Sequence, residues 1–262
     1  MCRLVDPAAR KQIGKKVSRY RSSFSGFGIG GWTPAVKTLI IVCVVAFFLQ
    51  IFDRMTAGPS FTYKFGLTPY SVTHNFYLWQ LVTYIFLHDT SNLLHILFNM
   101  LGLWMFGSEL ERVWGTRQFT KFFFICGIGA GVLMVLLSPN STVPTIGASG
   151  AIYGVLLAFG LLFPNRIIIF YFFPIPAKWF VVIMGGLAFF SSLSSSGGGV
   201  AHVAHLGGML CGLVYLRGGR LFSGLRYRYN SWHRNRLRRR FDIYYNERRR
   251  DDDEPKWRRW RN

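Results

Sequence analysis

Long apolar runs separated by short polar connections dominate the chain between residues 36 and 216. A helix needs roughly 20 mostly apolar residues to cross a hydrocarbon core of about 30 Å. Six segments predict membrane-spanning helices, namely residues 36–53, 93–107, 117–137, 148–163, 177–193 and 200–216. The second and fourth are short. The pattern therefore predicts an all-α polytopic membrane protein.

Charge is concentrated outside these apolar runs. The chain carries a net charge of +20 although 51% of its residues are hydrophobic, and the two properties occupy different segments. We divide the chain into a basic segment (1–35), a six-helix domain (36–216) and a basic, aromatic-rich tail (217–262). The first apolar run begins too late for a cleavable signal peptide, so we expect an uncleaved anchor.

The distribution of Lys and Arg predicts the orientation, because short cytoplasmic loops retain basic residues. With both termini cytoplasmic, all but two of the 31 Lys and Arg residues lie inside, the exceptions being Arg54 and Lys64. We therefore expect an integral, multi-pass protein of the plasma (inner) membrane with cytoplasmic termini. Its external loops are then residues 54–92, 138–147 and 194–199.

The first external loop is long and rich in aromatic residues. Such residues suit the membrane interface, where the ring body is buried and a polar edge stays hydrated. The aromatic residues are Phe61, Tyr63, Phe65, Tyr70, Phe76, Tyr77, Trp79 and Tyr84. We expect this loop to lie half embedded beside the helix bundle.

Two polar residues within the apolar segments carry candidate chemistry. Ser149 opens the fourth segment and His205 lies in the sixth. The helical rise puts them about 22 Å and about 18 Å from the cytoplasmic ends of their helices, hence at similar depth. Polar groups at membrane depth are usually functional, and a hydroxyl with an imidazole is the minimum pair for nucleophilic catalysis. His202 matches the depth of Ser149 slightly better, so depth leaves both histidines as candidates.

Small residues predict that the fourth and sixth helices pack closely. Each carries two glycines at the four-residue spacing that lets membrane helices touch backbone to backbone. The pairs are Gly150 with Gly154 and Gly208 with Gly212. The second pair shares a helix face with His205, which favours His205 over His202 as the partner of Ser149.

A nucleophile also needs donors for the oxyanion of the tetrahedral intermediate. His95 and Asn99 are four residues apart on the second helix, hence on one face and at a similar depth. Together with the backbone N–H of Ser149 they are candidates for this role. The alternative is that they only link helices by hydrogen bonds. Tyr153, one turn after Ser149, is placed to pack on the His205 ring.

Four motifs, taken in order, resemble the rhomboid intramembrane serine proteases over residues from about 79 to 216. They are His95-Ile-Leu-Phe-Asn99, Gly107-Ser-Glu-Leu-Glu111-Arg-Val-Trp-Gly115, Gly147-Ala-Ser149-Gly150 with Tyr153, and Ala204-His205-Leu-Gly-Gly208. The motif from Gly107 to Gly115 follows the second helix, so we expect Glu111 and Arg112 to hold a cytoplasmic turn there.

The resemblance implies a rhomboid-like six-helix bundle in which Ser149 is the nucleophile and His205 the general base of a dyad without an acidic third member. It implies that His95 and Asn99 bind the oxyanion. The motifs also supply the supporting residues Tyr153, Gly147, Gly150 and Gly208. Substrates would be transmembrane segments of other membrane proteins, cut near the external face, and helix five with its outer loop (191–199) would form a lateral gate.

Other functions fit the sequence less well. Residues 202–205 read His-Val-Ala-His without the acid of a zinc-protease motif, and the apolar segments lack a pair of aspartates. We expect neither a metal nor a cofactor. A transporter would need charged residues along its pore. The main rival is a non-catalytic rhomboid-like protein that binds membrane helices.

The tail from Arg217 mixes arginines with tyrosines and tryptophans. Anionic lipid headgroups attract such segments with about 1 kcal/mol per charge, and nucleic acid also accepts basic and stacking groups. A tail tethered beside a membrane meets lipid at a higher local concentration. We therefore expect anionic lipid, and not nucleic acid, as its partner.

Overall fold

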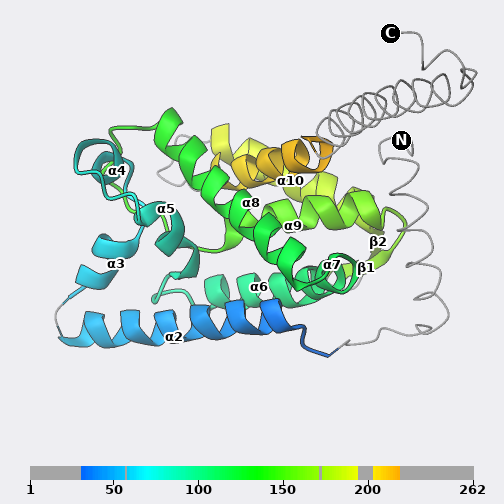
Figure 1. Ribbon diagram of the computed structural model, residues 1–262, viewed down its shortest axis with the longest axis horizontal. Helices are drawn as coiled ribbons and strands as arrows, with labels where there is room; N and C mark the ends of the chain where they lie inside the picture. The colour runs from blue at the N-terminus through cyan, green and yellow to red at the C-terminus, as the bar shows by residue number, and fades with distance from the viewer. Residues whose placement is uncertain (1–30, 57, 171–172, 194–202, 219–262) are drawn as a thin grey trace, which may run out of the picture. The chain divides into compact units, whose positions relative to one another are not determined.

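The computed structural model describes residues 31–56, 58–170, 173–193 and 203–218. This part of the chain is mostly helical (Figure 1). The elements in chain order are α2 (Pro34–Thr56), α3 (Ser60–Phe65), α4 (Pro69–His74), α5 (Gln80–Thr83), η1 (Tyr84–Phe86), α6 (Leu93–Gly102), η2 (Leu103–Gly107), α7 (Ser108–Trp114), α8 (Thr116–Leu137), α9 (Ser149–Leu162), β1 (Ile167–Phe170), β2 (Phe173–Pro176) and α10 (Ala177–Leu193). A further helix spans Val203–Gly218.

Within the described residues, three helices are long and apolar enough to cross a membrane: α2, the continuous helix Leu93–Trp114, and α8. The shorter apolar helices are Ser149–Leu162, Ala177–Ser192 and Val203–Gly218. Apolar helices therefore occupy all six segments that the sequence predicts. Since only three have spanning length, the count of six spans stays a prediction.

The helix Leu93–Trp114 is longer than the predicted segment and is not uniform. Its middle part, η2, is a π-helical turn that separates α6 from α7. It ends at Trp114, and the next residue, Gly115, has φ +83°, a conformation that glycine adopts far more readily than other residues.

A small antiparallel hairpin joins α9 to α10 and departs from the predicted all-helical class. Strands β1 and β2 pair from Ile167 with Pro176 to Phe170 with Phe173. Because side chains alternate across a strand, Ile168 is buried while Ile167 and Ile169 are exposed. The hairpin lies with α7 at the end of the bundle opposite to α3, α4 and α5 (Figure 1).

The carboxylate of Glu111 joins three helices. The first N–H groups of a helix have no partner within it, and Glu111 accepts hydrogen bonds from Ala35 and Val36 at the start of α2, at 2.9 and 3.0 Å. It also accepts from the Thr116 hydroxyl at 2.7 Å. The expected structural role of Glu111 is thus wider than one turn, because this side chain, 3% exposed, links α7 to α2 and α8.

Arg112, beside it, forms an ion pair with Glu109 at 3.3 Å and donates to the Gly31 carbonyl at 2.6 Å. The second interaction ties the chain before α2 to α7. Arg112 therefore ties α7 to the chain before α2, whereas the bond between Glu111 and Thr116 spans the turn at Gly115.

The first loop between α2 and α6 is folded around the Gln80 side chain, which is fully buried. Its Oε1 accepts the Thr68 N–H at 3.0 Å, and its Nε2 donates to the Tyr63 and Lys64 carbonyls, each at 3.2 Å. A single amide thus satisfies three backbone groups in two parts of the loop, the end of α3 and the residue before α4.

Two backbone hydrogen bonds connect this loop to the segment that precedes α9. Leu67 N–H donates to Thr145 O at 2.9 Å, and Thr145 N–H donates to Leu67 O at 2.8 Å. They form an isolated antiparallel bridge. The first loop therefore helps to position the start of α9.

Tyr84 is not an interfacial residue, and that part of the sequence prediction is wrong. Its side chain is only 1% exposed, and its hydroxyl donates to the Gly127 carbonyl of α8 at 2.6 Å. A buried tyrosine with a satisfied hydroxyl packs as a core residue. Other aromatic side chains of the loop are exposed, namely Tyr63, Tyr70, Phe76, Tyr77 and Trp79.

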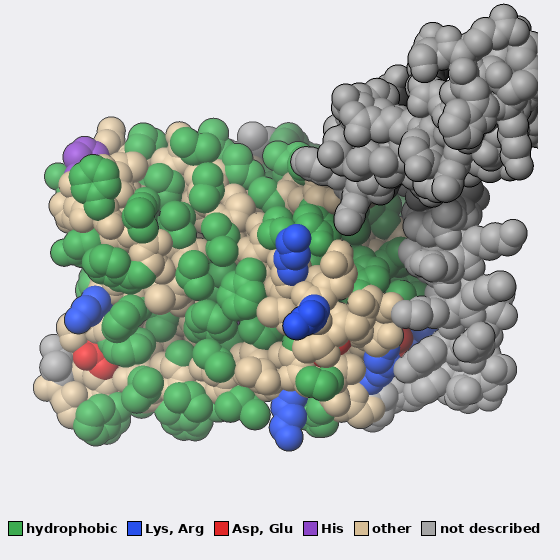
Figure 2. Space-filling view, in the orientation of Figure 1, with side chains coloured by type: hydrophobic (Ala, Val, Ile, Leu, Met, Phe, Trp, Pro, Cys, Tyr) green, Lys and Arg blue, Asp and Glu red, His purple; other side chains and the backbone are tan. Residues whose placement is uncertain are grey.

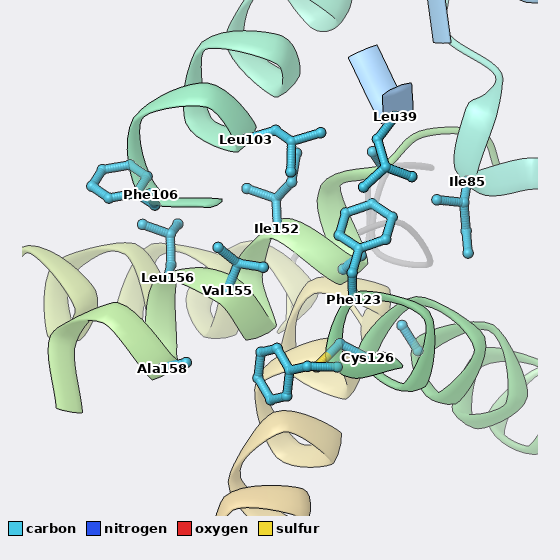
Figure 3. Packing of buried hydrophobic residues seen from close by; sticks show 14 of the residues in the cluster. Leu39, Ile85, Leu103, Phe106, Phe123, Cys126, Ile152, Val155, Leu156 and Ala158 are labelled. Atoms are coloured by element: carbon cyan, nitrogen blue, oxygen red, sulfur yellow. The ribbon is translucent and has the colours of Figure 1, made fainter. Parts of the chain in front are cut away.

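The short helix α9 lies among the other helices and supplies much of the core. Its side chains Ile152 and Leu156 point towards Leu103 and Phe106 of η2 (Figure 3). Phe106 also meets Phe159 edge to face, with ring centroids 5.0 Å apart. By contrast, hydrophobic side chains cover most of the outer face in Figure 2, and most Lys and Arg of that face lie in the half that holds α7.

Glycines bring α9 and the helix Val203–Gly218 into backbone contact. A Cβ atom on Gly208 would overlap the Gly150 carbonyl, and one on Gly212 would lie 3.3 Å from the Gly154 Cα. The close approach predicted from the glycine spacing is therefore confirmed.

Replacing Glu111 by Gln should destabilise the fold. An amide keeps the shape but sets an NH2 group against backbone N–H donors, so we expect a loss of about 1–3 kcal/mol in the free energy of unfolding. Denaturant titration in detergent measures it. The control, Glu109→Gln, disrupts ion pairs with Arg112 and Arg166 that are more open to solvent, and it should cost less than about 1 kcal/mol. Equal losses in the two variants would contradict the capping role.

Replacing Gly208 by Ala should separate two helices that now touch. Overpacking of this kind costs about 1–3 kcal/mol, measured by the same unfolding titration. Gly186→Ala on α10 is the matched control, because a Cβ there meets nothing within 4 Å. A Gly208→Ala variant as stable as the control would show that the contact is not needed.

Candidate active site

Ser149 is the first residue of α9 and follows a constrained turn. Gly147, two residues earlier, has φ +128°, a conformation that side-chain-bearing residues rarely adopt. Its N–H donates to the Tyr84 carbonyl at 3.0 Å. The buried Tyr84 thus holds the peptide that leads into Ser149.

The Ser149 hydroxyl forms a hydrogen bond with His205 of the helix Val203–Gly218. The distance from Ser149 Oγ to His205 Nε2 is 2.7 Å, although the residues are 56 positions apart in the chain. If the serine donates, Nε2 is unprotonated and can accept the hydroxyl proton. Both side chains are only partly buried.

Tyr153 packs on the His205 ring. The two ring centroids are 4.3 Å apart and the ring planes differ by 3°, which is a stacked arrangement. Tyr153 lies one turn after Ser149 on α9. One helix face therefore presents the hydroxyl and also holds the plane of the imidazole that meets it.

His95 borders the same hydroxyl. A Cβ on Gly147 would lie 2.9 Å from His95 Nε2 and 3.7 Å from Ser149 Oγ, so both polar atoms surround the space that this glycine leaves open. His95 Nδ1 accepts the Asp89 N–H at 3.3 Å. In a neutral ring the proton then resides on Nε2, the atom nearer to Ser149.

Asn99, one turn later on α6, is buried, and its amide donates to the His95 carbonyl at 2.8 Å. This bond uses one of the two amide hydrogens. The structure thus brings Ser149, His205, Tyr153 and His95 together, and gives Asn99 a hydrogen bond within its own helix.

Sequence reasoning missed the segment before α6, which contributes to the site. His88 is fully buried, and its ring centroid lies 5.3 Å from that of His95. Burial, reinforced by the neighbouring His95, lowers the pKa of His88 to about 4, so its ring is uncharged at neutral pH. The only signal in the sequence is a polar run from His88 to Asn92 ahead of an apolar helix.

Asp89 and Asn92 shape this segment. Partial burial alone would raise the pKa of Asp89, but hydrogen bonds from the Ser91 hydroxyl and N–H outweigh it and hold the pKa below its usual value. Asn92 caps α6 by accepting the Leu94 N–H at 3.1 Å. The segment thus has a fixed conformation next to His95.

Some predicted features lie outside the described residues. They are His202 and most of the proposed gate, residues 194–199, together with nearly all of the terminal segments 1–35 and 217–262. In the part of the chain that the structure describes, no group of three or more His, Cys, Asp or Glu residues could hold a metal ion.

Comparison with known proteins identifies related chains. Over 127 residues, 46% of this chain and 36% of the relative, it is 35% identical to "Rhomboid protein 1, mitochondrial" of Saccharomyces cerevisiae. It is 30% identical over 176 residues to "Rhomboid protease GluP" of Bacillus subtilis, covering 66% of this chain and 32% of that protein. It is 25% identical over 181 residues to "Rhomboid protease GlpG" of Yersinia pestis, covering 69% and 61% respectively.

The matched part of this chain spans about a third of the length of the first two relatives. Together with its apolar helices, the likeness indicates an integral membrane protein. The Rhomboid domain model matches residues 75–220, which is more than half of the chain and includes Ser149, His205 and His95. The chain therefore belongs to the rhomboid family.

Proposed function

We propose that this protein is an intramembrane serine endopeptidase that cleaves transmembrane segments of other membrane proteins. The observation that carries the proposal is the 2.7 Å hydrogen bond between Ser149 Oγ and His205 Nε2. A serine that donates to an unprotonated imidazole has its general base in place. Relatives that are named rhomboid proteases support the same class of reaction.

In the proposed mechanism, Ser149 Oγ attacks the carbonyl carbon of the scissile peptide while its proton moves to His205 Nε2. The tetrahedral intermediate collapses when Nε2–H protonates the leaving amine, which departs and leaves an acyl ester on Ser149. Water then attacks the ester with Nε2 as base, releases the carboxylate product and restores the hydroxyl. Tyr153 keeps the imidazole plane fixed through both proton transfers.

The oxyanion needs donors that exist before the reaction. The backbone N–H of Ser149 belongs to the first turn of α9, where N–H groups lack intrahelical partners. His95 Nε2 borders the same space beside Gly147. We assign the oxyanion to these two donors, with Asn99 contributing through its second amide hydrogen.

The rival function, a non-catalytic rhomboid-like protein that binds membrane helices, needs neither a base nor a nucleophile. A paired serine and histidine with a stacked tyrosine is an arrangement that helix binding alone does not require. The described residues therefore favour the protease.

We also propose that all six apolar helices cross the membrane with both termini in the cytoplasm, in the plasma (inner) membrane. The support is the excess of Lys and Arg on one side of this topology. The mitochondrial relative makes an organelle membrane the alternative location.

Replacing Ser149 by Ala should abolish cleavage of a model transmembrane substrate, because no other group takes the place of the attacking oxygen. Wild type should also react with a fluorophosphonate probe, and Ser149→Ala should not. The measurements are a gel-based cleavage assay in detergent and fluorescence of the labelled band. Thr38→Ala, which removes a hydroxyl bonded to its own helix α2, is the control and should retain both activities.

The rival function would be favoured if wild type neither cleaves the substrate nor reacts with the probe, although a cooperative unfolding transition shows that it is folded. Cleavage by Ser149→Ala would refute the assignment of the nucleophile.

Removing residues 226–262 should weaken binding to vesicles that contain anionic lipid without stopping catalysis. The arginines of this tail attract anionic headgroups, whereas the site lies elsewhere in the chain. Vesicle co-sedimentation and the cleavage assay measure the two effects separately. A truncated enzyme that is folded but inactive would give the tail a role in the reaction.

A further inference from the structure

Gln50 is a buried polar residue within the apolar helix α2. Gln50 is 2% exposed. Burying an amide in an apolar helix costs free energy unless its N–H and C=O groups are hydrogen-bonded. Its Oε1 accepts the His88 N–H at 2.9 Å, and its Nε2 donates to the Thr62 hydroxyl at 3.0 Å. One side chain thus joins α2 to α3 and to the segment before α6.

The segment that Gln50 holds continues directly to His95. The residue after His88 is Asp89, whose backbone N–H donates to His95 Nδ1 at 3.3 Å. Asp89 is itself held in a turn, because its carboxylate accepts the Ser91 N–H at 2.9 Å. The Asp89 peptide is therefore fixed on one side by Gln50, through His88, and on the other by Ser91.

A backbone N–H can only donate, so its bond to Nδ1 stabilises the His95 tautomer with the proton on Nε2. A carboxylate partner would instead favour a charged ring. Nε2 faces the space beside Gly147 that Ser149 Oγ also borders. The tautomer of His95 is thus set by the Asp89 peptide group, which lies outside the motifs of the site.

The buried ring of His88 supports the same arrangement. Its Nε2 has no hydrogen-bond partner among the residues that the structure describes, and the ring packs beside that of His95. Because the pKa of His88 is lowered to about 4, the ring stays neutral at working pH and adds no charge next to His95.

We propose that Gln50 is a positioning residue: by holding the His88–Asp89 segment, it lets the Asp89 N–H fix His95 in the Nε2–H form and direct that donor to the oxyanion. This inference rests on the proposed proteolytic function. Gln50 acts through His88, Asp89 and His95 and does not touch the substrate.

The test compares Gln50→Met, Gln50→Glu and Thr62→Val in the full chain. Met keeps the length of the side chain but removes the acceptor for His88, so kcat should fall at least about tenfold with KM little changed, since the lost interaction acts on the transition state. Glu retains an acceptor oxygen and should recover most of kcat. Thr62→Val removes only the other partner of Gln50 and should keep the wild-type kcat.

The tautomer of His95 gives a second, independent readout. Nitrogen NMR of protein labelled at histidine, with His95→Gln to assign the signal, should show Nε2 protonated and Nδ1 unprotonated in wild type. In Gln50→Met the His95 signal should move towards a mixture of tautomers. A structural role of Gln50 alone would lower stability without changing this signal.

The inference is overturned if Gln50→Met cleaves with the wild-type kcat, if Thr62→Val loses as much kcat as Gln50→Met, or if wild-type His95 is protonated on Nδ1. If Gln50→Met does not fold, Gln50→Glu and Thr62→Val decide: both keep the acceptor for the His88 N–H, so a loss of about tenfold in kcat in either variant overturns the inference. Failure of the proposed function is distinct, because it would appear as wild type that neither cleaves nor reacts with the fluorophosphonate.

Discussion

The backbone contact between α9 and the helix Val203–Gly218 is the constraint on which the site depends. Gly208 leaves room for the Gly150 carbonyl, and this approach brings two helices close enough for a side-chain hydrogen bond between Ser149 and His205. Hydrophobic attraction between helices is weak in lipid, so close packing and polar contacts decide which helices meet. The spacing of the glycines thus determines how closely Ser149 and His205 can approach.

Buried polar side chains then hold the segments between the helices in place. Gln80, Gln50 and Glu111 are each nearly inaccessible, and each bonds to backbone groups of a distant segment. In a nonpolar environment, a backbone group without a hydrogen bond costs several kcal/mol of free energy, so a side chain that bonds to it stabilises a non-helical segment more than it would in water. They explain how an irregular first loop can stay folded beside a hydrophobic bundle.

The apolar runs and glycine pairs predicted where helices lie and which two of them touch, because both signals are local and periodic. Depth left both His202 and His205 as partners for Ser149, and the glycine face and the family pattern favoured His205; the catalytic role of the pair stays a prediction. The burial of Tyr84 and the bonds of Gln50 and His88 could not be predicted, since they depend on partners distant in the sequence. The short hairpin at Ile167 was likewise hidden, because its apolar residues have no turn signal between them.

Helix α9 has 14 residues, about 21 Å, and falls short of a hydrocarbon core of about 30 Å. A short helix facing lipid would force the bilayer to thin around it. Most residues of α9 are instead covered by other helices, so protein neighbours absorb this mismatch. The level of Ser149 is consequently set by its neighbouring helices and not by lipid, and we expect it to stay the same in membranes of different thickness.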